Sequence, residues 1–144
     1  MRTLPRLLLL PALAMILAAC STGDTSREVR TVVVSMSDEM RYDPAEFDFF
    51  VGETVRFEVT NAGSLRHEFF VSDVAGHEEH AAEMSGGGHG SMGADEPGLV
   101  SVEPGDTESL EYTFQAAGEL MAACHEPGHY EAGMVAPISV HPRS

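Results

Sequence analysis

Residues 54–60 read TVRFEVT and alternate strictly between polar and apolar side chains. This period of two places the three apolar side chains on one face of an extended strand, as in a sheet strand with one buried face. The same alternation occurs over residues 47–51 and again over residues 110–114. The pattern therefore predicts several sheet strands rather than amphipathic helices.

Further short runs rich in β-branched and aromatic residues complete this picture. They lie at residues 32–34, 69–71, 99–102 and 135–140. Residues 119–123 fit either a strand or a turn of helix, and no segment has a convincing helical period. Seven or eight strands separated by turn residues predict an all-β sandwich or barrel. The 144 residues suffice for a single core and so for one domain.

The N-terminal segment has the features of an export signal. Arg2 and Arg6 precede an apolar run over residues 7–19, which ends in Leu-Ala-Ala before Cys20. This ending resembles a bacterial lipoprotein box, and the resemblance implies cleavage before Cys20, acylation of Cys20 and anchoring to a membrane of the cell envelope. An ordinary signal peptide or a short membrane anchor is the alternative. We expect a signal peptide over 1–19, a tether over 20–27 and a single domain over 28–144.

The segment CHEPGHYEAGM spaces Cys124, His129 and Met134 at equal intervals. The chain has two cysteines, and lipidation or cleavage at Cys20 leaves Cys124 without a disulfide partner. Thiolate and thioether are soft ligands that favour copper, and imidazole binds both of its oxidation states. A copper site of this kind needs one distant histidine, for which His67 is the candidate. Core packing of the thiol and the thioether is the alternative interpretation.

Several motifs together resemble those of the cupredoxins, especially the bacterial envelope copper-resistance cupredoxins. The similar stretches are GETVRF at 52–57, RHEF at 66–69, PGDT at 104–107 and ACHEPGHYEAGM at 123–134. The resemblance covers about residues 29–140. It implies a Greek-key β-sandwich and one type 1 copper held by His67, Cys124, His129 and Met134. Many electron-carrying cupredoxins have Asn after the first histidine ligand, where this chain has Glu68.

His125 raises the alternative of a copper enzyme, because a histidine beside the ligand cysteine can bind a second copper. Multicopper oxidases use His-Cys-His, and residue 123 is Ala here. The repeated domains of those oxidases and of copper nitrite reductases are not found in this sequence. We therefore expect no catalytic residues and a protein that is not an enzyme.

Residues 73–98 interrupt the strand pattern with Gly, Ala, acidic residues, His and Met. A loop of this length is either functional or disordered. Its possible secondary copper ligands are His77, His80, Met84, His89 and Met92, of which the first three have a helical spacing that could share one face. A soluble insertion without a role is the alternative.

The net charge of −15, with no lysine, argues against nucleic acid as a partner. It favours cations or a basic partner, although a solvated surface explains it equally well. We expect copper handling in the cell envelope, with copper and a redox or copper-transfer protein as partners. The alternatives are a one-electron carrier and a subunit of a copper-dependent oxidoreductase.

Overall fold

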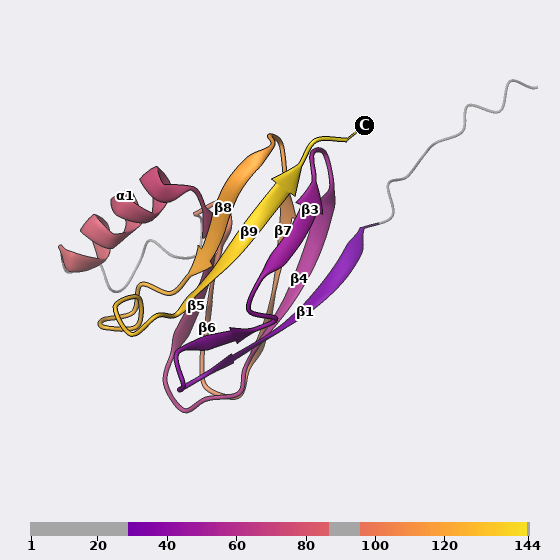
Figure 1. Ribbon diagram of the computed structural model, residues 1–144. Coiled ribbons are helices and arrows are strands. Elements are labelled where there is room, and N and C mark those ends of the chain that lie inside the picture. The colour runs from indigo at the N-terminus through magenta and orange to yellow at the C-terminus, as the bar shows by residue number, and fades with distance from the viewer. Residues whose placement is uncertain (1–28, 87–95, 144) are drawn as a thin grey trace, which may run out of the picture.

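The computed structural model describes residues 29–86 and 96–143, which form nine strands and one helix (Figure 1). The first sheet contains four strands in the order β2-β1-β4-β7, and the second contains five in the order β3-β9-β8-β5-β6. The strands are β1 (Arg30–Ser37), β2 (Arg41–Asp43), β3 (Phe47–Phe50), β4 (Thr54–Asn61), β5 (His67–Ser72), β6 (Leu99–Val102), β7 (Thr107–Thr113), β8 (Gly118–Ala123) and β9 (Val135–His141). The predicted all-β, cupredoxin-like sandwich is confirmed. The described strands number nine, where seven or eight were expected. The three residues of β2 are too few to show an alternating pattern in the sequence.

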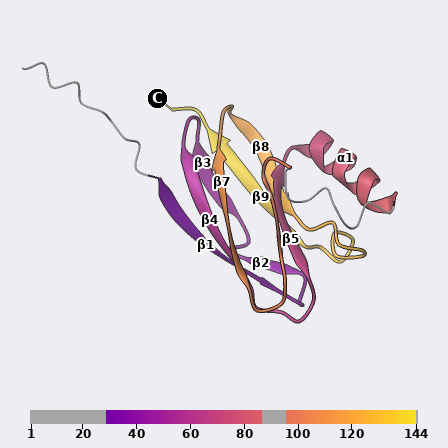
Figure 2. The same ribbon diagram turned by 180° about the vertical axis from the view of Figure 1, so that it is seen from behind.

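Both sheets are mostly antiparallel, with β1–β4 and β3–β9 as the parallel pairs among the described strands. The ambiguous residues 119–123 belong to β8, which pairs with β5 and β9. Parallel strands cannot be joined by a hairpin and need a longer connection. The chain therefore crosses from one sheet to the other between some of its strands. Figure 2 shows the molecule from behind, with β1, β4 and β7 of the first sheet towards the viewer.

The alternating residues meet in an aromatic core between the sheets. Phe57 of β4 is fully buried and lies 5.1 Å from the ring of Phe69 of β5 and 5.7 Å from that of Phe49 of β3. Phe49 in turn stacks on Phe114 at 4.3 Å. Such edge and offset contacts between aromatic rings add to the gain from burial. The period of two in the sequence therefore identifies the core correctly.

One expectation is wrong: the first half of the 73–98 insertion is not a loop. Residues Val74–Ser85 form the helix α1, which begins at Asp73, whose side chain accepts a hydrogen bond from the Gly76 N–H. An N-terminal cap of this kind and the helix-favouring Ala, Glu and Met residues explain why the segment is helical. A 12-residue helix is marginal by itself, so its stability depends on packing.

Helix α1 packs beside β5 and β8, outside the sandwich (Figure 1). As a result β5 is buried on both faces: Phe69 faces the core, while Phe70 contacts the rings of His77 and His80 at 4.9 Å each. Gly76 lies so close to β5 that a Cβ there would collide with the Ser72 side chain. The loop between β8 and β9 lies near the helix in both views.

β1 begins and β9 ends at the end of the sandwich away from the β8–β9 loop (Figure 1). The signal and tether expected over residues 1–27 lie outside the described residues. Within the described part of the chain, no helix has the length and apolar character needed to cross a membrane.

Candidate metal centre

Three ligand atoms meet at one end of the sandwich. His67 is the first residue of β5, Cys124 directly follows β8, and His129 lies in the β8–β9 loop. The Nδ1 atom of His129 is 3.2 Å from Nδ1 of His67 and 3.3 Å from Sγ of Cys124. One ligand atom from each of the three residues lies within 4.8 Å of the others, and all three side chains are buried.

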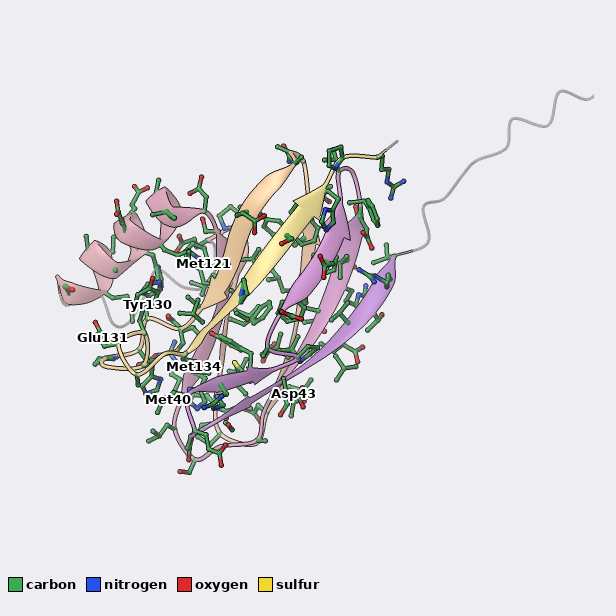
Figure 3. All side chains as sticks on the ribbon, viewed as in Figure 1. Met40, Asp43, Met121, Tyr130, Glu131 and Met134 are labelled. Carbon is green, nitrogen blue, oxygen red and sulfur yellow. The ribbon has the colours of Figure 1, made fainter. Side chains whose placement is uncertain are left out.

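Met134 closes this group from the end of the loop, which Figure 3 marks by Tyr130, Glu131 and Met134. Its side chain is fully buried. Its backbone N–H donates to the carbonyl of His129, and its carbonyl accepts from the Cys124 N–H. The loop thus folds back on itself and fixes the methionine beside the other two ligands.

The turn that makes this possible depends on Gly128. Gly128 has a φ of 83°, in the left-handed region that side chains with a Cβ rarely adopt. The His129 N–H donates to the Glu126 carbonyl at 3.0 Å, which closes the turn around Pro127 and Gly128. The Pro-Gly pair therefore directs His129 back towards Cys124, as the sequence predicted.

The thiol of Cys124 is fully buried and accepts a hydrogen bond from the Glu68 N–H at 3.3 Å. Burial raises the pKa of the thiol to about 12, and the Glu68 and Glu126 carboxylates act in the same direction while backbone hydrogen bonds oppose it. A thiol of this kind keeps its proton unless a metal displaces it. The donor set of one thiol, two imidazoles and a buried thioether fits copper.

His67 is held from its other side by Asp38. Its Nε2 lies 3.3 Å from Asp38 Oδ1, which leaves Nδ1 directed at His129. Burial lowers the pKa of His67, although the contact with Asp38 opposes this effect. Asp38 also accepts hydrogen bonds from Ser64 and Leu65, which lower its own pKa. A carboxylate on the second ring nitrogen orients a histidine ligand and fixes its tautomer.

The helix brings a second group of histidines close to this centre. His77 and His80 are buried, with 3% and 4% of their surface exposed, whereas Met84 is half-buried. His77 Nδ1 lies 3.0 Å from Nε2 of His125, whose ring stacks on Tyr130. The structure thus places His77 and His80 against the sandwich and not on an exposed loop. His89, Met92 and Cys20 lie outside the described residues.

The family profile of copper-binding proteins of the plastocyanin/azurin family matches residues 29–141. The chain is a cupredoxin of this family. The chain is 42% identical to the copper-resistant cuproprotein CopI of Rubrivivax gelatinosus over 118 residues, which cover 82% of this chain and 70% of that protein. It is 38% identical to CopI of Pseudomonas aeruginosa over 140 residues, covering 78% and 77%.

The solved structure of reduced auracyanin from Roseiflexus castenholzii has the same fold as this cupredoxin. The two superpose with a TM-score of 0.68 at 21% identity, over 78% of this chain and 97% of that one. The family profile and the CopI relatives confirm the predicted resemblance and the copper cofactor. The structure brings His67, Cys124 and His129 together, with the buried Met134 at the end of the same loop.

Sequence reasoning missed two residues that shape the site. Asp38 lies 29 residues before His67, and no motif connects them. Asn61 is fully buried at the end of β4, donates to the carbonyls of Leu65 and Val102, and accepts from the Gly63 N–H. The cluster Asn-Ala-Gly-Ser identifies a turn there, but it gives no sign that the amide holds the loop before His67.

Proposed function

We propose that this cupredoxin holds one copper ion as a type 1 centre and acts in copper handling in the cell envelope. The observation that carries the proposal is the buried group of His67, Cys124 and His129 with Met134 beside it. A thiolate and two imidazoles with a weak axial thioether form a type 1 ligand set, which supports one-electron exchange between the two oxidation states of copper. No step of bond-breaking chemistry is assigned to these residues, and the protein is proposed not to be an enzyme.

The role in copper handling is supported by the CopI relatives, whose names describe them as copper-resistant cuproproteins. The same proposal includes export by residues 1–19 and acylation at Cys20. A tether leading to β1 would join the sandwich at the end away from the copper ligands (Figure 1). An anchor there leaves the metal site facing away from the membrane surface.

Electron transfer is the second function that the geometry supports. His129 is 9% exposed, and Tyr130 and Leu65, each adjacent or close to a histidine ligand, are 39% and 46% exposed. Apolar side chains at the edge of a redox site suit a small, transient docking surface. The third alternative, a subunit of a copper-dependent oxidoreductase, needs turnover of a substrate in addition to this site.

Growth at raised copper concentration tests the proposed function. A copper-sensitive strain would express the full chain, the variant His129→Gln or the matched variant His141→Gln. His141 is the last residue of β9, is exposed and pairs with Asp48, away from the metal centre. We expect the full chain and His141→Gln to restore growth and His129→Gln to fail at equal protein level. Equal growth of all three strains would overturn copper handling and favour the electron carrier.

A further inference from the structure

The strongest unexplained feature outside the copper centre is the position of His80. This histidine is 4% exposed and lies between two carboxylates. Its Nε2 is 3.3 Å from Oε2 of Glu68, and its Nδ1 is 2.9 Å from Oε2 of Glu96. The second contact does not have the angles of a hydrogen bond, so Nδ1 is a buried nitrogen without a hydrogen-bond partner. A buried polar atom in this state is costly, and a bound ion is one of the few arrangements that would satisfy it.

The chemistry of the two contacts differs. A carboxylate only accepts hydrogen bonds, so the Glu68 contact places the ring proton on Nε2. The other ring nitrogen, Nδ1, lies 2.9 Å from the Glu96 carboxylate but makes no hydrogen bond to it. Glu83, one turn further along α1, brings a third ligand group: one ligand atom from each of His80, Glu83 and Glu96 lies within 4.8 Å of the others. A metal ion among these atoms would be bound by all three and would satisfy Nδ1 of His80.

His77 shows that burial on α1 does not by itself leave a nitrogen unused. Its Nε2 lies 3.1 Å from the carbonyl of Met121, which Figure 3 marks where β8 lies beside the helix. Its Nδ1 lies 3.0 Å from Nε2 of His125. One ring nitrogen donates to a carbonyl and the other pairs with a histidine, so both are satisfied. The two histidines therefore differ: both ring nitrogens of His77 have partners that dock the helix, whereas Nδ1 of His80 has no hydrogen bond.

We propose that His80, Glu83 and Glu96 form a second metal site for copper(II), separate from the Cys124 centre. One nitrogen and two carboxylate oxygens, with no sulfur, suit copper(II) rather than copper(I), and among common divalent ions copper(II) binds such ligands most tightly. Glu68 is a positioning residue, because its carboxylate holds the N–H of His80 on the side away from the metal. Carboxylate, histidine and metal in this order are a recurrent arrangement.

Glu68 also connects the two sites. Its backbone N–H donates to Cys124 Sγ at 3.3 Å, and its Oε2 atom accepts from the His125 N–H at 3.2 Å as well as facing His80. The residue that replaces the more common Asn thus belongs to the copper centre by its backbone and to the second site by its side chain. The biological role of this second site rests on the proposed copper handling. Its existence is tested separately.

Copper loading with electron paramagnetic resonance tests the second site. Purified full chain would be loaded with excess copper(II), freed of loosely bound metal by gel filtration, and analysed for total copper, visible absorption and paramagnetic signals. We expect two copper ions per chain and a second signal with the large hyperfine splitting of nitrogen- and oxygen-bound copper(II). The double variant Glu83→Gln, Glu96→Gln should lose that signal and one copper ion while it keeps the visible thiolate band.

The matched control is the double variant Glu78→Gln, Glu79→Gln, which removes the same charge from exposed positions of the same helix. It should keep both copper ions. The proposal is overturned if the wild-type protein shows one copper ion and no second signal, or if the second signal survives in the Glu83 and Glu96 variant. Equal loss in the control would also overturn it, since binding would then follow total charge. Cys124→Ser should abolish the visible band and keep the second signal, so failure of the type 1 centre is distinguishable.

Discussion

The Oδ1 atom of Asp38 lies 3.3 Å from Nε2 of His67, on the opposite side of the ring from the Nδ1 atom that faces His129. The same carboxylate accepts hydrogen bonds from the N–H and hydroxyl of Ser64 and from the N–H of Leu65. One side chain from the turn between β1 and β2 therefore holds both the loop before β5 and the first histidine of the site. The hydrogen bonds that lower the Asp38 pKa keep this acceptor charged.

Replacing Asp38 should weaken copper binding without unfolding the sandwich. Asp38→Ala removes the acceptor that orients His67 and frees the loop over residues 62–66, so we expect copper affinity to fall by about 10- to 100-fold. Competition with a chelator of known affinity measures this. Asp48→Ala is the matched control, because Asp48 pairs with His141 in an exposed contact far from the copper ligands. Unchanged affinity in Asp38→Ala would show that His67 needs no such support.

Met134 should control the reduction potential more than the stability. Met134→Leu nearly conserves the volume of a fully buried side chain, so we expect a loss of less than about 1.5 kcal/mol in the free energy of unfolding. Loss of the thioether removes its electron donation to the metal and makes the site more apolar, so the potential should rise. Spectroelectrochemical titration measures the potential, and thermal unfolding of the copper-free protein measures the stability. An unchanged potential would contradict an axial role for Met134.

The close approach of α1 to β5 at Gly76 gives a test of helix docking. Gly76→Val places a branched side chain against Ser72, and overpacking of this kind costs about 1–3 kcal/mol. Ala82→Val is the matched control on the exposed face of the same helix, where the loss of helix propensity costs about 0.7 kcal/mol at most. Chemical denaturation compares the two. Equal effects would mean that the helix does not pack on β5 as described.

The strands and the three proposed ligands around the β8–β9 loop were predictable because they depend on local sequence. Alternation in residues 54–60 reports one buried face, and β4 buries Val55, Phe57 and Val59 accordingly. Cys124, His129 and Met134 lie in one loop, where Pro127 and Gly128 fix the turn. The distant His67 was predicted because the ligand set needs one more histidine, and the family motif supported it; no local period identifies it.

The helix and the supporting residues were harder to predict because their signals are not local or not apolar. The face of α1 that packs inward carries His77 and His80, so no apolar stripe marks it. The usable signals were the capping Asp73 and the Ala- and Glu-rich composition. The contact between Asp38 and His67 joins residues 29 positions apart and leaves no pattern in the sequence.

Visible absorption of the copper-loaded protein tests the central claim most directly. The measurement compares the wild-type protein, Cys124→Ser and the matched variant Cys20→Ser, which makes the same change at the cysteine outside the proposed site. A type 1 centre predicts an intense thiolate-to-copper charge-transfer band in the wild type and in Cys20→Ser, and its loss in Cys124→Ser. A colourless copper complex of the wild-type protein, or a band that survives in Cys124→Ser, would contradict the account.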